Sequence, residues 1–142
     1  MVVSAFSWQV RVYWEDTDGG GIVYYANYLR FLERARTEWL RAQGISQHAL
    51  ARDPGVVFSV VAVQAEYHRP ARLDDLLRVS CEPHRQGGAS ISFAQHIWRQ
   101  GGSGAGAPDE QLLLTASVRV ACLDGRTMKP RRLPVVVAQG LP

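Results

Sequence analysis

The sequence lacks most of the patterns on which metal and nucleophile chemistry usually depend. It has only two cysteines, Cys81 and Cys122, with no CxxC pair and no Cys/His ligand spacing, so we expect no zinc site. It also has no G-x-S-x-G elbow and no P-loop. We expect both cysteines to be small buried residues in a reducing compartment.

Long apolar segments and strong charge are missing as well. No apolar run approaches the ~20 residues that span a bilayer, so we expect no integral membrane segment. The first residues, MVVSAFSWQVRV, lack the basic region and long apolar core of a secretory signal, so we expect a cytoplasmic protein. The net charge of +3, from 16 basic and 13 acidic residues, is too small to indicate nucleic-acid binding. It is compatible with a substrate that carries phosphates.

The remaining composition is that of an ordinary globular chain. With 142 residues, 46% of them hydrophobic, we expect a single domain over residues 1–142. Alternation over Trp8 to Trp14 predicts a strand, and the period becomes helical from Val23 to Gln43. Gly44 is well placed to end that helix, and Ser46 to cap a short second helix. The predicted buried face of the long helix comprises Tyr28, Phe31, Leu32, Ala35 and Trp39.

Strand patterns dominate the rest of the chain. They cover Val56 to His68, Leu76 to His84, Ser90 to Arg99 and Leu112 to Leu123, whereas residues 133–142 give no assignable pattern. One long helix and a series of strands joined by short turns predict an α+β fold with one antiparallel sheet. Val56 to Val63 is apolar at nearly every position, so we expect burial on both faces and self-association of the uncovered sheet surface.

An unusual junction joins the first strand to the long helix. Asp16 and Asp18 precede the three glycines Gly19 to Gly21, and the helix begins a few residues later. The residues alone favour a turn in which each carboxylate accepts backbone N–H groups. The alternative is a reaction centre, because a carboxylate beside the open N–H groups of a helix start can perform acyl transfer.

Other polar residues give weaker signals. No histidine pairs with a serine or cysteine at a recognisable spacing. We expect all four histidines to be surface or packing residues: His48, His68, His84 and His96. A basic cluster after the last strand is either a solvated turn or a phosphate-binding rim, and it comprises Arg126, Lys129, Arg131 and Arg132.

The junction and its helix, VRVYWEDTDGGGIVYYANYLRFLERARTEWLR, closely resemble the signature of the hotdog-fold acyl-CoA thioesterases. The resemblance is to the group containing 4-hydroxybenzoyl-CoA thioesterase and the Tol–Pal-associated YbgC-like enzymes. It continues through SQHAL, EYHRPARLDD and MKPRRLP. It implies a long helix wrapped by an antiparallel sheet. It also implies a homodimer, or a homotetramer built as a dimer of dimers, with active sites at the subunit interface.

The resemblance further implies hydrolysis of an acyl-CoA, with an acyl carrier protein thioester as an alternative substrate, without metal or cofactor. It makes Asp18 the nucleophile or the general base, and a backbone N–H at Tyr25 or its immediate neighbour the group that polarises the carbonyl. The remaining residues assigned to substrate binding are Gly20, Gly21, Val23 and Tyr24 near the thioester, and Arg126, Lys129 and Arg131 near the phosphates.

One position departs from the YbgC-like pattern. Those enzymes commonly have VYHA where this chain has VYYA, so Tyr25 replaces a histidine. A backbone role survives this replacement, whereas a side-chain acid–base role stays open. Two other functions also stay open, a non-catalytic scaffold that binds acyl thioesters and a hotdog dehydratase.

Overall fold

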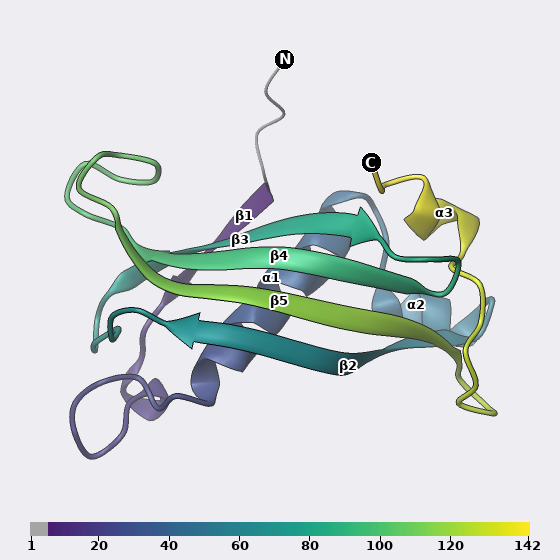
Figure 1. Cartoon of the computed structure of the whole chain (residues 1–142), viewed down its shortest axis with the longest axis horizontal. Coiled ribbons are helices and arrows are strands. Elements are labelled where there is room, and N and C mark those ends of the chain that lie inside the picture. Colours follow the sequence, from purple (N-terminus) through teal and green to yellow (C-terminus); the bar gives the residue numbers. More distant parts are fainter. Residues whose placement is uncertain (1–5) are drawn as a thin grey trace.

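The computed structural model describes residues 6–142 and confirms the predicted α+β architecture, with one sheet and one long helix behind it (Figure 1). The elements are β1 (Phe6–Arg11), the 3₁₀ turn η1 (Trp14–Asp16), α1 (Asn27–Ala42), α2 (Gln47–Arg52), β2 (Val56–Tyr67), β3 (Leu76–Arg85), β4 (Ser90–Arg99), β5 (Gln111–Asp124) and α3 (Val135–Ala138).

All neighbouring strands of the sheet are antiparallel, in the order β1-β3-β4-β5-β2, so β1 and β2 are its edges. Alternate residues of β4 are buried, Ile91, Phe93 and Ile97 among them, as expected for a strand with one face on the core. The glycine-rich segment after Arg99 connects β4 to β5 as a hairpin loop.

Helix α1 buries the face that its periodicity predicts. Tyr28, Phe31, Leu32, Ala35 and Trp39 are all buried. At its end, the N–H groups of Gly44 and Ile45 donate to the carbonyls of Arg41 and Leu40, and Gly44 has a φ of +78°. This is a Schellman ending, in which glycine tolerates the left-handed conformation. Within residues 6–142, no helix combines the length and the apolar character needed to cross a membrane.

Two predicted boundaries are wrong at the junction before α1. β1 ends at Arg11 instead of Trp14, because the chain turns where the Tyr13 N–H donates to the Asp16 carboxylate at 2.8 Å. The helix begins at Asn27 instead of Val23, because the Val23 N–H is bonded to the distant carbonyl of Ala71 at 2.9 Å. Long-range pairing therefore replaces the first predicted turn of helix.

The expected burial of β2 on both faces is also wrong within one chain. β2 is an edge strand that pairs only with β5 among the described strands, with a register shift between Val60 and Ala62. The exposed fractions of Val60, Val61 and Val63 are 46%, 51% and 43%. The apolar pattern of this strand thus marks a surface that one chain leaves open.

Candidate active site

The acids and glycines before α1 form a small hairpin. Thr17 and Val23 pair as an antiparallel bridge, and the Asp18 N–H donates to the Ile22 carbonyl at 2.8 Å. Gly21 has a φ of +79°, a conformation that L-residues with side chains rarely adopt. The hairpin therefore returns the chain from the acids to the start of the helix within a few residues.

Asp16 anchors this hairpin and is buried. Its carboxylate accepts the Tyr13 N–H, while its backbone carbonyl accepts the Tyr24 N–H and the Asn27 side-chain amide, both at 2.9 Å. One residue thus ties the end of the first strand to the helix start. These contacts support the structural role that we expected for Asp16.

Asp18 lies at the exposed tip of the hairpin. Its Oδ1 accepts the Gly20 N–H at 2.7 Å, which is the Asx-turn that the residues predict. Its Oδ2 has no hydrogen-bond partner within residues 6–142. The turn fixes the carboxylate through one oxygen and leaves the other free, so the turn and a chemical role are compatible. A Cβ on Gly20 would lie 3.2 Å from Oδ1, so a small residue suits this position.

The helix start presents open N–H groups. The Tyr24 N–H donates to Asp16 and the Asn27 N–H donates to the Tyr24 carbonyl at 2.8 Å. Between them, the N–H groups of Tyr25 and Ala26 have no acceptor in the part of the chain that the structure describes. Ala26 is the N-cap of α1 and offers no side-chain cap. This end can hydrogen-bond a carbonyl oxygen, and the helix dipole favours negative charge there.

Tyr24 and Tyr25 immediately precede the N-cap of the helix, and their aromatic rings lie close together. Their centroids are 4.9 Å apart, and 65% of Tyr25 is exposed. The Tyr25 hydroxyl makes no hydrogen bond to the described residues, but its backbone carbonyl accepts the Tyr67 hydroxyl at 2.9 Å. Sequence reasoning missed Tyr67, whose only signal was its place in EYHRPARLDD.

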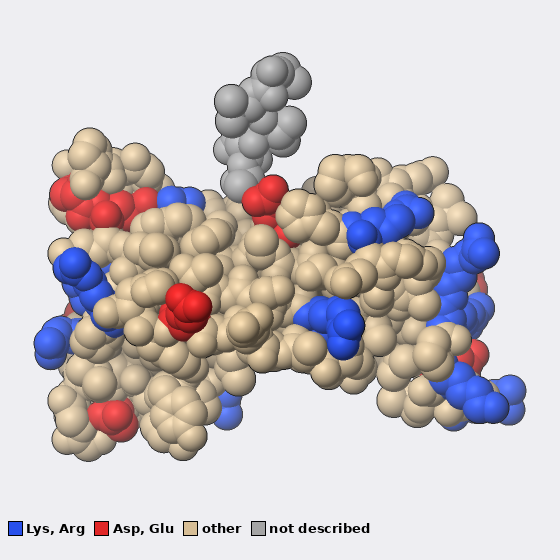
Figure 2. Space-filling view, in the orientation of Figure 1, with Lys and Arg blue, Asp and Glu red and all other residues tan. Residues whose placement is uncertain are grey.

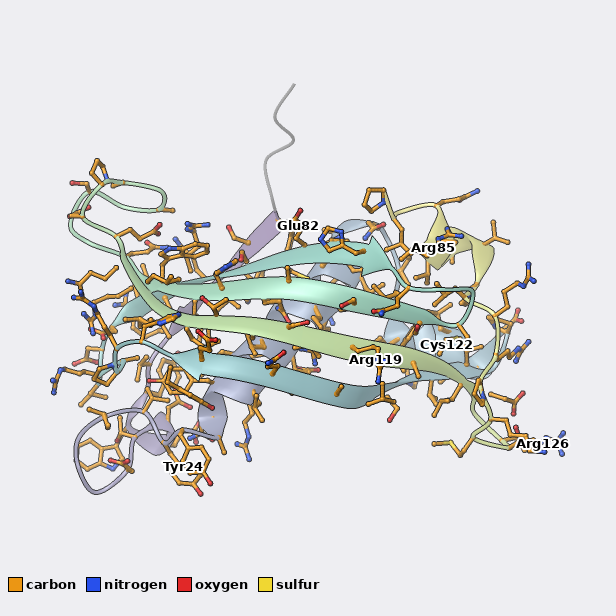
Figure 3. The ribbon with its side chains drawn as sticks, in the orientation of Figure 1. Tyr24, Glu82, Arg85, Arg119, Cys122 and Arg126 are labelled. Carbon is orange, nitrogen blue, oxygen red and sulfur yellow. The ribbon has the colours of Figure 1, made fainter. Side chains whose placement is uncertain are left out.

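The basic cluster does not join Asp18 within one chain. Figure 3 places Arg126 at the opposite end of the sheet from Tyr24, and Figure 2 shows basic side chains gathered at that far end. Arg131 donates to the carbonyl of Pro54 at 2.8 Å and is an internal support of this turn. Arg126 and Lys129 are exposed. One chain alone therefore contains two separate halves of the predicted site.

Asp124 organises the basic turn. Its Oδ1 accepts the N–H groups of Thr127 and Arg126, both at 2.9 Å. These backbone hydrogen bonds hold the pKa of Asp124 below its ordinary value. The carboxylate stays ionised and rigid, and the two exposed basic side chains project from a fixed turn.

The cysteines take no part in this site. Both are free and buried, as predicted. Burial raises the pKa of Cys81 to about 12, so its nucleophilic thiolate form is absent near neutral pH.

Comparison with known proteins identifies the family. A model of the thioesterase superfamily matches residues 20–105, which is more than half of the chain. The chain belongs to the thioesterase superfamily. It is 46% identical to the acyl-CoA thioester hydrolase YbgC of Escherichia coli O6:H1 over 134 residues, covering 94% of this chain and 93% of that protein.

Solved structures of thioesterases have the same fold. A probable thioesterase from Bartonella henselae is 36% identical, covers 92% of this chain and 100% of its own, and gives a TM-score of 0.80. A 4-hydroxybenzoyl CoA thioesterase mutant complexed with 4-hydroxybenzoyl CoA gives a TM-score of 0.85 at 22% identity, covering 97% and 99% of the two chains. The first supports the superfamily assignment, and the second shows the hotdog fold.

Proposed function

We propose that the protein hydrolyses acyl-CoA thioesters to a carboxylic acid and CoA, with Asp18 as the reacting carboxylate. The observation that carries this proposal is the hairpin that joins an exposed carboxylate, fixed through one oxygen, to a helix start with two open N–H groups. Superfamily membership and the YbgC relatives supply the reaction class.

The open N–H groups of Tyr25 and Ala26 would bind the thioester carbonyl oxygen and stabilise the negative charge that develops on it. Asp18 has two routes. As a nucleophile, its free oxygen bonds to the carbonyl carbon, the C–S bond breaks, and water then cleaves the mixed anhydride. As a general base, it takes a proton from the water that attacks the same carbon; the C–S bond then breaks, and the proton passes to the departing thiolate of CoA. Both routes require an ionised Asp18.

Self-association through β2 would complete the site. The open edge exposes Val60, Val61 and Val63, and a groove beside it is lined by residues of β2, β5 and α1, including Val118 and Leu29. An exposed apolar edge of this kind is suited to pairing with another strand. A second copy of β2, paired antiparallel about a two-fold axis, would bury this surface.

The same pairing would bring together the two separated halves of the site. In a two-fold pair centred on β2, the Val56 end of one strand lies beside the Tyr67 end of the other. Tyr67 contacts Tyr25 at the helix start, and Arg131 contacts Gly55 immediately before Val56. Each reaction centre would therefore lie near the basic turn of the other subunit.

This arrangement gives Arg126 and Lys129 a role. Their exposed charges suit the phosphates of CoA, whereas Arg131 holds the turn in place. A homodimer is thus the smallest assembly that joins the carboxylate, the open N–H groups and the phosphate contacts. Pairing of dimers into a tetramer would leave this site unchanged.

A thiol-release assay with a panel of acyl-CoAs tests the proposed function. The panel includes short, long and aromatic acyl groups and one acyl carrier protein thioester. Release well above the uncatalysed rate supports hydrolysis. Tight binding without release would instead support a scaffold, and hydration or dehydration of the acyl chain without thiol release would support a dehydratase.

A further inference from the structure

Tyr67 connects the end of β2 to the start of α1. Its hydroxyl donates to the backbone carbonyl of Tyr25 at 2.9 Å, across 42 residues of sequence. Its ring packs edge-on against the buried Tyr28, with centroids 5.4 Å apart and planes at 76°. The ring therefore has its own packing partner, and the hydroxyl has a separate contact at the candidate active site.

The carbonyl that Tyr67 holds belongs to the same peptide unit as the Ala26 N–H. A trans peptide is planar and points its N–H away from its C=O. Fixing the Tyr25 oxygen therefore fixes the direction of the Ala26 N–H. A carbonyl that accepts a hydrogen bond also polarises the N–H of its own unit, since hydrogen bonds in a chain strengthen one another.

The preceding peptide unit is held differently. The Tyr24 carbonyl accepts the backbone N–H of Asn27 at 2.8 Å, and this contact orients the Tyr25 N–H. Two consecutive open N–H groups are thus aimed by two hydrogen bonds, one from the backbone and one from the Tyr67 side chain. Only the second can be removed by a substitution that leaves the backbone intact.

We infer that Tyr67 is a positioning residue for thioester hydrolysis, which aims and polarises the Ala26 N–H at the carbonyl oxygen of the substrate. This inference rests on the proposed function. Partial desolvation raises the pKa of the Tyr67 hydroxyl, which favours the protonated form that acts as a donor.

Tyr67→Phe tests the inference because it removes the hydroxyl and keeps the ring. Loss of one direct oxyanion donor costs about 10²–10³-fold in kcat, and here a donor is misaligned instead of lost. We expect kcat to fall about 10-fold, with KM for the same acyl-CoA changed less than about 2-fold and Tm nearly unchanged. A kcat equal to that of the wild type overturns the inference.

Tyr28→Phe is the matched control. The Tyr28 hydroxyl accepts the Ala71 N–H at 2.9 Å in the core and does not contact the Tyr25 carbonyl. We expect this variant to show a lower Tm with kcat within about 2-fold of wild type, because a buried donor is left unpaired. If both variants lose Tm and kcat in parallel, the role of Tyr67 is only structural and the inference fails.

A spectroscopic measurement keeps the test independent of turnover. In assigned ¹H–¹⁵N spectra, we expect the Ala26 amide proton of Tyr67→Phe to move upfield more than the amide of Tyr25, because its polarising contact is lost. An unchanged Ala26 resonance overturns the inference. A wild-type enzyme without thiol release would refute the proposed function, whereas an unaltered Tyr67→Phe beside an active wild type refutes only the role of Tyr67.

Discussion

Replacing Val63 by lysine should separate the proposed dimer and lower its activity. Burying a whole valine side chain stabilises by about 1.5–3 kcal/mol. About half of each of Val60, Val61 and Val63 is still exposed. Complete burial of each valine would therefore add roughly 0.7–1.5 kcal/mol of stabilisation. A two-fold dimer contains each of these residues twice. The three valines would contribute about 4–9 kcal/mol before the entropic cost of association.

Val63→Lys removes two of those six contributions and places two like charges at the interface, where they must lose water. We expect association to weaken by at least about 3 kcal/mol, which is a rise in the dimer Kd of about 100-fold or more. Sedimentation across a dilution series measures that Kd. The activity measured in the same series should fall as the dimer dissociates, because each reaction centre loses the other subunit's basic turn.

Val136→Lys is the control for this experiment. Val136 is 52% exposed and lies on α3, away from the β2 edge, so the same substitution there should leave both Kd and kcat/KM near their wild-type values. The reasoning would be refuted if Val63→Lys kept the wild-type Kd, or if a dissociated Val63→Lys monomer retained full kcat/KM.

Two further predictions concern charged residues. The double variant Arg126→Glu/Lys129→Glu should raise KM for an acyl-CoA about 10-fold or more at low salt. The reason is that losing about 1.4 kcal/mol of binding free energy from the phosphate contacts weakens binding tenfold. An acyl thioester of N-acetylcysteamine has no phosphate and should show no change; an equal effect on both substrates would contradict the phosphate role. Separately, a hydrogen bond from Arg78 lowers the pKa of Glu110 below its ordinary 4.5. The ion pair of Glu110 with Arg78 therefore contributes its full stabilisation above the ordinary pKa of Glu110. This stabilisation is lost as the pH falls through the lower pKa that Glu110 has in the folded protein. In urea unfolding from pH 6 to pH 3, the free energy of unfolding should fall less for Arg78→Leu than for the wild type. An equal fall in the two proteins would contradict this linkage.

Local patterns predicted most of the fold. The buried face of α1, the Gly44 ending and the strand β4 follow the sequence periodicity almost residue for residue. These features depend on neighbours within a few positions. The short helix α3 at Val135–Ala138 was not predicted, because residues 133–142 have no clear period.

Long-range contacts account for the errors at the site. The helix start moved from Val23 to Asn27 because Ala71, far along the chain, takes the Val23 N–H. Tyr67 was missed for the same reason, since its partner Tyr25 is 42 residues away. Figure 3 places Arg126 and Tyr24 at opposite ends of the sheet, and this separation depends on the course of all the strands, which no local sequence pattern records.

The Asp18 prediction combines both kinds of information. The residues predicted a turn in which the Asp18 carboxylate accepts a backbone N–H, and the structure shows that the donor is Gly20. The free Oδ2 and the open N–H groups of the helix start, which make a reaction possible, become visible only when the hairpin is folded. The turn is therefore part of the proposed mechanism, because it positions the carboxylate.

The central claim is tested most directly by the turnover number of Asp18→Asn in the thiol-release assay. Asparagine can still accept the Gly20 N–H through its Oδ1, so the hairpin and Tm should be retained. It lacks the negative charge that attack or proton transfer requires, so kcat should fall by about 10²–10⁴-fold. Glu15→Gln, which removes a neighbouring exposed charge, should keep wild-type kcat. An Asp18→Asn enzyme with kcat within tenfold of the wild type would contradict the account.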